Sequence, residues 1–485
     1  EDIHLKYKVA RSAGGTEEES PVNPYKVNRP AGSGPLRVMG ARSNASICRA
    51  SSASRTLSAF HNTTLQPLLA QWRYEDSEDW TAETHWFDNK PWLKLYVCSS
   101  SDVVLLNPAN IIGNGWNTAA AGSAAFVAIR DEVSVGAETH VDMVAWGIPD
   151  WGGKLDSNVM DIKDVVEVSA TGCAYAARRR NGQVVCWGNP AEGGSLPPGE
   201  EDDFVQVRAG WHVFIGRKND GRLVGWGIAK LGANIPEAVS QHRDYVELCG
   251  GGGAFAARRA TGQIVAWGEP DLGGILGAGQ DSLNDIIQLS ASHAAFAALR
   301  EAGGVRSVIG WGHEGYGGHV PPAIAALANV RALGAATLSA FAILLDTGEV
   351  RGWGDVDYGG QVPTLIQSLT NVVEVSSTWY AFCARLSDGH VVAWGNPGTG
   401  GLVPEAIEQL SDVVQVVGSA RSFAALRRDG TVVAWGDPNF GGDTSQVAAE
   451  LVNVRAVYSN TNAFTALTSD GRVVTWGDAA GGGDS

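Results

Sequence analysis

Nine of the ten Trp-Gly dipeptides, all except Trp151-Gly152, recur at a nearly constant spacing, and this period constrains the fold of the chain more than any other feature. The intervals between successive copies are 41, 39, 41, 44, 42, 41, 41 and 41 residues. The tryptophans are Trp146, Trp187, Trp226, Trp267, Trp311, Trp353, Trp394, Trp435 and Trp476. A fixed period of this size is typical of repeat architectures, in which each unit buries its apolar face against its neighbours.

Each repeat unit predicts short β-strands. An alternating stretch such as Val-Val-Glu-Val predicts a strand covered on one face, and the apolar run Ala-Phe-Ala-Ala-Leu predicts a buried inner strand. Asp-Gly or Asn-Gly then predicts a tight hairpin leading into Val-Val-Ala-Trp-Gly, because both turn residues need a positive φ. A Gly-Gly turn and a Pro-led segment follow, for which we expect one helical turn. Three or four strands per unit are typical of a propeller blade, whereas the hairpin turns argue against a helical solenoid.

The units differ mainly in one distance. In seven units the tryptophan stands 12 positions after the aromatic residue of the apolar run. The distance is 15 residues from Phe296 to Trp311 and 20 from Phe126 to Trp146. We therefore expect longer hairpin loops in those two units.

The order of motifs resembles the repeat of the regulator of chromosome condensation family. The shared features are Gly-x-x-His before an apolar strand, a hairpin dipeptide, Val-x-Trp-Gly and Gly-Gly; Gly210-Trp211-His212 fits the His position closely and His293 loosely. The period of about 41 residues is closer to compact variants found in secreted bacterial propellers and protist proteins. The resemblance implies a β-propeller but no single activity, because the family spans nucleotide exchange, enzyme inhibition and scaffolding.

The predicted fold is all-β, with nine units over residues 105–485 and an irregular N-terminal arm over residues 1–104. Family members usually close with seven blades. We favour one closed ring of nine units, because two extra units could not bury their faces alone; an open array is the alternative. Val103–Leu106 together with Ile111 and Ile112 is our candidate for the closing strand.

The N-terminal residues carry two unusual compositions. No Asp or Glu occurs from Ser20 to Tyr74, a stretch with six Arg and many Ser, as in organelle transit sequences. Four tryptophans then fall among acidic residues: Trp72, Trp80, Trp86 and Trp92. These aromatic side chains could grip a partner or a sugar, or pack the arm onto the propeller.

No motif in the sequence predicts catalysis. The six cysteines form no C-x-x-C pair, and Cys173, Cys186, Cys249 and Cys383 take positions of small buried residues. Whether Cys48 and Cys98 pair stays open. The ten His show no metal-ligand spacing, and neither a nucleophile elbow nor a phosphate-binding loop occurs. We expect no enzyme, no metal and no cofactor, and we expect Gly250–Gly253 to relieve crowding near the propeller axis.

The variable loops are the best candidates for binding. Five residues after the repeat tryptophan, several units place a large apolar side chain: Trp151, Tyr316, Tyr358 and Phe440. Before the apolar runs stand Trp211 with His212, and Trp379 with Tyr380. Aromatic side chains in loops on a rigid scaffold are favoured interface anchors, although they could also wedge adjacent blades together. With Trp80 and Trp86, these are the predicted binding residues.

Charge narrows the class of partner. The chain has 52 acidic and 36 basic residues and a net charge of −16. Residues 1–116 hold 12 of each kind, so the remaining residues hold 40 acidic and 24 basic ones and carry the whole net charge. A chain this acidic is not expected to bind nucleic acid without sequence preference, and no window predicts a transmembrane helix.

Three functions are compatible with these observations. The favoured one is a non-enzymatic scaffold or accessory subunit that binds protein partners in a larger assembly. One candidate location is a protein assembly on a plastid or mitochondrial membrane, with which the chain would associate peripherally through its partners. The alternative is a secreted propeller that binds carbohydrate or inhibits an enzyme, and the third is a guanine-nucleotide exchange factor by family analogy.

Overall fold

The computed structural model describes residues 36–42, 56–88, 90–91, 93–99, 102–106, 111–115, 124–129 and 142–484. It also describes the backbone of four short strands: β1 (Ile3–His4), β2 (Pro24–Tyr25), β12 (Val133–Val135) and β13 (Glu138–His140). All structural statements below refer to these residues.

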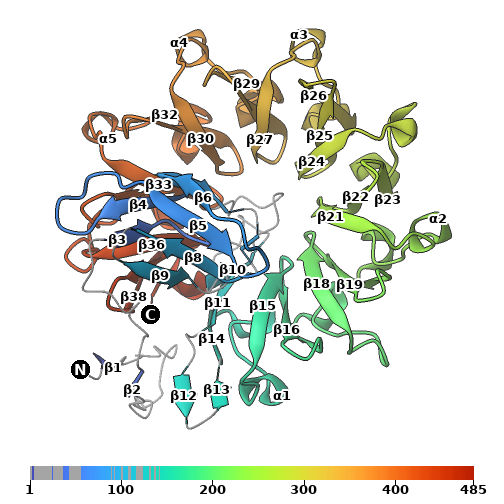
Figure 1. Ribbon diagram of the computed structural model, residues 1–485, viewed down its shortest axis with the longest axis horizontal. Helices are drawn as coiled ribbons and strands as arrows, with labels where there is room; N and C mark the ends of the chain where they lie inside the picture. Colours follow the sequence, from blue (N-terminus) through green and yellow to red (C-terminus); the bar gives the residue numbers. More distant parts are fainter. Residues whose placement is uncertain are drawn as a thin grey trace.

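The repeats form antiparallel three-stranded sheets, numbered here as units 1 to 9 and arranged around a common centre (Figure 1). Units 1 to 3 comprise β10, β11 and β14 (Ile111–Gly113, Ala125–Ile129, Met143–Gly147), β15 to β17 (Val165–Ala170, Ala174–Arg179, Val184–Gly188) and β18 to β20 (Phe204–Ala209, Val213–Lys218, Leu223–Gly227). Units 4 to 6 comprise β21 to β23 (Tyr245–Gly250, Ala254–Arg259, Ile264–Gly268), β24 to β26 (Ile286–Ala291, Ala295–Ala302, Val305–Gly312) and β27 to β29 (Val330–Ala336, Ala340–Leu345, Val350–Gly354). Units 7 to 9 comprise β30 to β32 (Val372–Ser377, Ala381–Leu386, Val391–Gly395), β33 to β35 (Val413–Gly418, Ser422–Arg427, Val432–Gly436) and β36 to β38 (Val454–Ser459, Ala463–Thr468, Val473–Gly477).

A short helical segment follows each Trp-Gly and lies on one face of the array. These segments are η1 (Pro149–Trp151), η2 (Pro190–Glu192), η3 (Ala229–Leu231), η4 (Pro270–Leu272), η6 (Glu314–Tyr316), η7 (Val356–Tyr358), η8 (Pro397–Thr399), η9 (Pro438–Phe440) and η10 (Ala479–Gly483). A helical turn forms in five of the connections: α1 (Ser157–Met160), α2 (Glu237–Ser240), α3 (Pro322–Ala325), α4 (Thr364–Gln367) and α5 (Glu405–Glu408). Four of them follow a proline as expected, whereas α1 follows Asp156. In unit 5 a 3-10 turn, η5 (Gln280–Ser282), precedes the first strand instead.

The alternating strand, and not the apolar one, is nearest the centre, which corrects the sequence-based assignment. The first strands of neighbouring units contact one another, β15 with β18 and β18 with β21, and Figure 1 shows them toward the middle. The apolar run forms the middle strand, for example the wholly buried β31. This strand is buried because it lies between the first and third strands of its own sheet, and because neighbouring units cover both faces of that sheet.

The two longer units lengthen their hairpins by pairing more residues. In unit 5, β25 and β26 extend by cross-strand pairs such as Ala302 with Val305. In unit 1 the insertion forms a second hairpin from β12 and β13. The expected longer loops are therefore largely additional β structure.

Stacked aromatic residues join each unit to the preceding one. In unit 7, Phe382 of β31 pairs across the sheet with Trp394 of β32, and their ring centroids lie 5.2 Å apart. The Trp394 Nε1 donates to the carbonyl of Gly359, which follows η7 of unit 6, over 2.9 Å. Gly359 has φ +84°, and a Cβ there would lie 2.7 Å from the Phe382 ring. The Gly-Gly turn therefore lets one unit lie directly on the aromatic pair of the next.

A belt of backbone hydrogen bonds runs around the centre on the face that carries the η segments. At one loop position per unit, the N–H donates to the equivalent loop of the next unit, over 2.6 to 3.3 Å. The belt residues are Gly115, Gly172, Trp211, Gly252, His293, Leu338, Trp379, Ala420 and Thr461. The Thr461 N–H of unit 9 donates to the carbonyl of Asn114 in unit 1 over 3.1 Å.

The first and last units also contact each other through β10 and η10. Strand β10 contacts β36 of unit 9 and β15 of unit 2, and η10 contacts β14. A Cβ on Gly482 in η10 would lie 3.0 Å from Trp146, so this glycine meets the unit 1 tryptophan as Gly359 meets unit 7. Of the residues expected to form the closing strand, Ile111 and Ile112 lie in β10 and take part in this contact. Val103–Leu106 does not, because it pairs with Leu95–Cys98 in the N-terminal part.

The N-terminal part is not an irregular arm where it is described; it forms a small β unit with its own core. One sheet holds β3 (Leu36–Met39), β4 (Thr56–His61) and β7 (His85–Phe87); the other holds β6 (Thr81–Glu83), β5 (Ala70–Tyr74), β8 (Leu95–Cys98) and β9 (Val103–Leu106). Leu57, Trp72, Leu95 and Val97 are fully buried between them. Strand β9 crosses the boundary expected at residue 104 and belongs to this unit.

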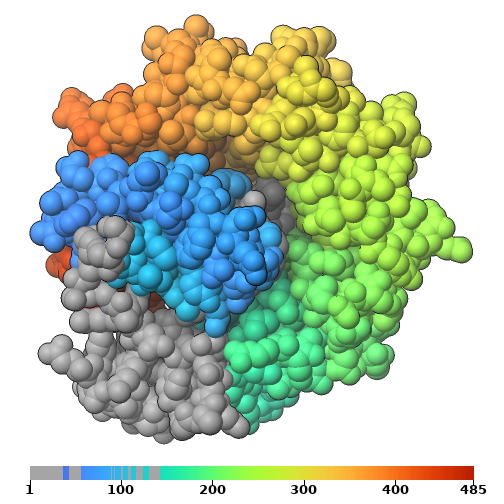
Figure 2. Space-filling view, viewed as in Figure 1, coloured from blue at the N-terminus to red at the C-terminus, as the bar shows by residue number. Residues whose placement is uncertain are grey.

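The N-terminal unit packs on the propeller face opposite the η segments, over the units nearest the C-terminus (Figure 2). The Gly40 N–H donates to the carbonyl of Arg455 over 2.9 Å, next to the contact between β3 and β36. Met39 and Phe60 join the apolar cluster of units 8 and 9. This anchoring fixes the N-terminal unit on one side of the array.

Candidate functional site

The loops between first and middle strands and the η segments form one continuous surface, here called the aromatic face. A repeated hydrogen bond holds the two kinds of loop together in seven of the nine units: a polar side chain before the belt residue donates to a carbonyl of the η segment. In units 3 and 4 a glycine, Gly210 or Gly251, takes this position. Thr337 donates to Tyr358 over 3.0 Å, and Ser419 donates to Phe440 over 3.0 Å. Variable side chains on this surface are therefore presented on a rigid frame.

Two tryptophans from opposite sides of the array meet at the centre of the aromatic face. Trp211 of unit 3 and Trp379 of unit 7 have ring centroids 5.4 Å apart, and His293 of unit 5 lies 4.7 Å from Trp211. Trp211 is 6% exposed and Trp379 5% exposed. Both were predicted binding residues; instead they fill the axis, and they have little surface left for a partner.

The small belt residues make room for these large ones. A Cβ on Gly252 would lie 2.5 Å from the His293 ring, and one on Gly250 would lie 2.6 Å from Gly210. The expectation that Gly250–Gly253 relieves crowding near the axis is confirmed. The glycines of units 3 and 4 therefore leave space at the axis, and the large side chains of other units extend into that space.

Around this centre, units 5 to 7 carry an arc of partly exposed tyrosines, here called the tyrosine arc (Tyr316, Tyr358 and Tyr380). The rings of Tyr358 and Tyr380 lie 5.1 Å apart. The pKa of Tyr358 is raised by partial burial and by Tyr380, Asp355, Tyr316 and Asp357. Tyrosine rings and carboxylates therefore lie close together in this sector.

The tyrosine arc continues into unit 8 through a cation. The guanidinium of Arg421 lies 5.7 Å from the ring centroid of Tyr380 and 5.1 Å from that of Phe440. Its Nη1 lies 3.9 Å from Asp437 Oδ2. Phe440 is 9% exposed, so this predicted binding residue mainly supports Arg421 and the junction between units.

On the other side of the axis, His212 pairs with Glu192. The His212 Nδ1 lies 2.8 Å from Glu192 Oε2, and this hydrogen bond holds the pKa of Glu192 below its usual range. The pair joins the loop of unit 3 to the η segment of unit 2. His212 is therefore occupied within the chain, in a junction between units.

The three remaining predicted residues lie at different depths. Trp151 is half-buried at the end of η1, where its carbonyl accepts from Asn114 Nδ2 over 2.7 Å. Trp86 stacks on buried Trp72 at 5.8 Å, so it builds the N-terminal core. Trp80 is 42% exposed, with the Arg73 guanidinium 4.9 Å from its ring. Trp92 and Cys48 lie outside the described residues.

The acidic partners of the tyrosine arc, Asp355 and Asp357, were not among the predicted binding residues; the sequence indicated them only as turn residues. Asp355 stands two residues after a repeat tryptophan, where its Oδ1 accepts from the N–H of Asp357 over 2.9 Å and starts η7. Sister units use Asn396 or Asp437 for the same purpose. A comparison of this position across the repeats is the signal that would have identified it.

Most other charged groups are paired within the propeller. On the opposite face, Arg300 pairs with Asp285 at 2.7 Å and Arg427 with Asp412 at 2.9 Å. Burial opposes ionisation of Glu167, but Arg208 and Arg178 outweigh burial and hold its pKa below the usual range. These pairs hold strands of one unit, or of neighbouring units, together.

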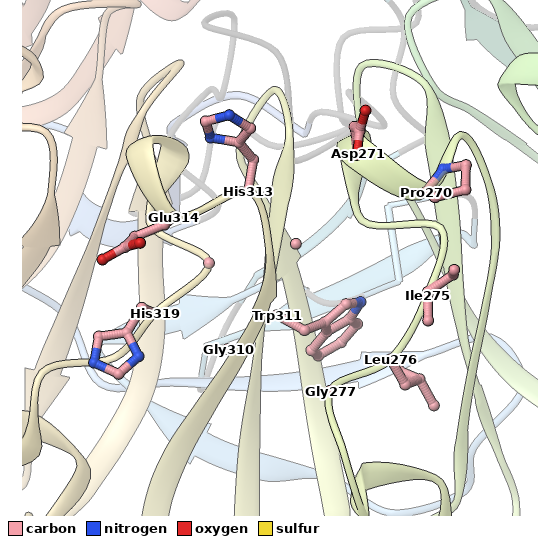
Figure 3. A pocket seen from close by; sticks show the side chains of 12 residues that line it. Pro270, Asp271, Ile275, Leu276, Gly277, Gly310, Trp311, His313, Glu314 and His319 are labelled. Atoms are coloured by element: carbon pink, nitrogen blue, oxygen red, sulfur yellow. The ribbon is translucent and has the colours of Figure 1, made fainter.

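A groove of about 530 Å³ lies between units 4 and 5 (Figure 3). Pro270, Asp271, Ile275 and Leu276 line one wall, and His313, Glu314 and His319 line the other. The Nδ1 of His313 accepts from the N–H of Gly315 over 3.1 Å, so this imidazole starts η6. The groove is open to solvent and has no converging set of polar groups.

The cysteines of the repeats behave as small apolar residues, as expected. Cys173, Cys249 and Cys383 are buried, and burial raises the pKa of Cys186 to about 12. Across the described residues, no three His, Cys, Asp or Glu come together as metal ligands. No helix in that part of the chain is long and apolar enough to span a membrane.

Strand order, repeated sheets and contacts between units define the chain as a repeat β-propeller. No protein-family model and no curated protein matches the sequence. Among solved structures, the ectodomain of the Physcomitrella patens receptor kinase CR4 matches with 15% identity and a TM-score of 0.38 over 62% of this chain and 77% of that one. Prp20p from Saccharomyces cerevisiae matches with 16% identity and a TM-score of 0.35 over 77% and 81%. BamB from Moraxella catarrhalis matches with 12% identity and a TM-score of 0.27 over 71% and 95%.

Proposed function

We propose that this protein is a non-enzymatic interaction propeller, an accessory subunit that binds a protein partner through the aromatic face. The observation that carries the proposal is the tyrosine arc, which presents half-buried aromatic side chains on loops held by repeated hydrogen bonds. Tyrosine combines a large contact area with a hydroxyl group and has few rotatable bonds, and it is therefore enriched in interface hot spots.

The proposal includes the architecture that supports the face: nine units closed into one ring. The hydrogen bond from Thr461 to Asn114 and the packing of η10 on β14 support closure. A closed ring covers the outward faces of the first and last sheets and keeps the loops of units 5 to 8 in fixed relation. The N-terminal unit covers part of the opposite face and leaves the aromatic face to a partner.

The first experiment measures the native particle isolated from its source, by gel filtration with light scattering and mass spectrometry. A tagged chain carries either the native residues or Tyr358→Thr with Tyr380→Ser. These substitutions copy Thr399 and Ser339, which take the same positions in sister units, so the fold should be retained. We expect the native chain to migrate well above 50.9 kDa with reproducible companions, and the double variant to lose them.

The matched control is Leu365→Ala in α4, which removes an 84% exposed apolar side chain from the outer edge. It should retain the companions. A lone 50.9 kDa species from the native source would contradict the accessory-subunit proposal. Companions lost equally from the control would contradict the assignment to the aromatic face.

A further inference from the structure

Unit 8 shows what kind of group the aromatic face accepts. Arg421 follows a belt residue, its carbonyl accepts from the N–H of Asp437 over 3.0 Å, and its guanidinium lies by Phe440 and Asp437. An aromatic ring with a neighbouring carboxylate attracts a guanidinium through the negative ring face and the opposite charge. The chain thus provides its own example of a cation held on this surface.

Unit 6 has the same frame without the cation. Ser339 stands where unit 8 has Arg421, and its carbonyl accepts from the N–H of Asp355 over 2.9 Å. Tyr358 takes the place of Phe440, and Asp355 that of Asp437. Aromatic ring and carboxylate are both kept, while the basic side chain is replaced by a hydroxymethyl group.

The charged side chains that act on Tyr358, Asp355 and Asp357, are both acidic. Asp355 is half-buried and Asp357 and Glu314 are exposed, and none of the three pairs with a basic side chain among the described residues. On the opposite face, aspartates such as Asp285 and Asp412 each form an ion pair with an arginine. An external cation would therefore complete unit 6 as Arg421 completes unit 8.

We propose that the tyrosine arc binds a basic segment of a partner protein, with one arginine or lysine side chain placed at Tyr358 beside Asp355 and Asp357. This inference rests on the proposed interaction function and specifies the chemistry of its partner. The occupant is a cationic polypeptide because the face combines unpaired carboxylates with half-buried tyrosine rings and already accommodates a guanidinium. An acidic partner would face uncompensated like charges here.

The test uses the full chain and short fluorescent peptides of alternating Arg and Gly, Lys and Gly, or Glu and Gly, followed by anisotropy. The decisive variant is Asp355→Asn with Asp357→Asn, which copies Asn396 and Asn439 of sister units. The amide oxygen of the new Asn side chain can accept the hydrogen bond that starts η7, as the Asn396 oxygen does for η8. We expect this double variant to weaken binding of the Arg peptide by about tenfold at an ionic strength of about 0.15 M. Tyr358→Thr should weaken it by about fivefold.

The control variant is Glu405→Gln with Glu408→Gln, which removes the same two charges from exposed positions on α5. It should bind the Arg peptide within about twofold of the native chain, because exposed charges beyond the Debye length contribute little. Equal losses in the two double variants, or equal binding of the Glu peptide, would overturn the proposal. The two proposals can also fail separately. If the Arg peptide binds no more tightly than the Glu peptide, the cationic partner is contradicted. If Tyr358→Thr with Tyr380→Ser nevertheless loses its native companions, the proposed interaction function is retained.

Discussion

At the residue scale, the repeat tryptophan combines packing with one directional hydrogen bond. Trp394 is 2% exposed, stacks on Phe382 and donates to the Gly359 carbonyl. Seven other repeat tryptophans donate to the equivalent glycine of the preceding unit, for example Trp435 to Gly400 over 3.0 Å. Each tryptophan is therefore both the core of its own sheet and the link to the unit before it.

Replacing Trp394 by Ala should lower the free energy of unfolding by about 3–5 kcal/mol, because it opens a cavity between two units. Thermal and urea unfolding followed by circular dichroism measure the change. Trp80→Ala is the control, since this 42% exposed tryptophan should cost less than about 1 kcal/mol. Equal stability of Trp394→Ala and the native chain would show that the Trp-Gly register is not structural.

At the element scale, the N-terminal unit depends on a buried charged network. Arg42 pairs with Asp88 at 2.8 Å, with side-chain exposures of 6% and 1%, and also donates to the carbonyl of Leu93 over 2.6 Å. The Tyr74 hydroxyl donates to Asp88 over 2.9 Å and accepts from Trp86 Nε1 over 3.2 Å. Strands β5 and β7 and the segment after β3 are thus joined around one carboxylate.

Arg42→Met should destabilise this unit by about 3–5 kcal/mol, because Asp88 is left as a buried charge without compensation. Amide hydrogen exchange measures the effect, and we expect faster exchange in β5 and β8 with β30 and β31 of the propeller unchanged. Arg42→Met combined with Asp88→Asn should recover part of the protection. Unchanged exchange in β5 would mean that the ion pair does not hold the unit together.

At the scale of the whole molecule, the C-terminal segment covers the first unit. Segment η10 lies on β14 with Gly482 against Trp146, as each earlier Gly-Gly turn lies on its following unit. The last residues therefore contribute to unit 1, although they follow unit 9 in the sequence. Contacts between such distant parts are what a closed propeller requires.

Deleting residues 478–485 should lower the melting temperature and expose unit 1, because the rings of Phe126 and Trp146 lose their cover. Hydrogen exchange should rise in β11 and β14 and stay low in β28 and β31. The milder Gly482→Ala, at φ +96°, should shift both measurements in the same direction. Native exchange in β14 after the deletion would show that units 1 and 9 do not depend on each other.

The sequence by itself determined what depends on local patterns. The period of the Trp-Gly dipeptide, the hairpin dipeptides and the Pro-led turns each act within one unit, so the strands, turns and buried cysteines were predictable. The same holds for the placement of Trp151, Tyr316, Tyr358 and Phe440 at one end of their units. These are consequences of backbone preference and alternation, which nearby residues set.

Only the tertiary structure decided what depends on distant residues. Trp211 and Trp379 are separated by 168 positions yet meet at the axis, which turned two predicted binding residues into packing. The fold of the N-terminal unit depends on the Arg42–Asp88 pair, which no local pattern reveals. Tyr358, Tyr380 and Arg421 come from three different units, and their contacts arise only when the units pack side by side. A sequence pattern places residues within a unit, but burial and charge pairing between units are set by the packing of the whole chain.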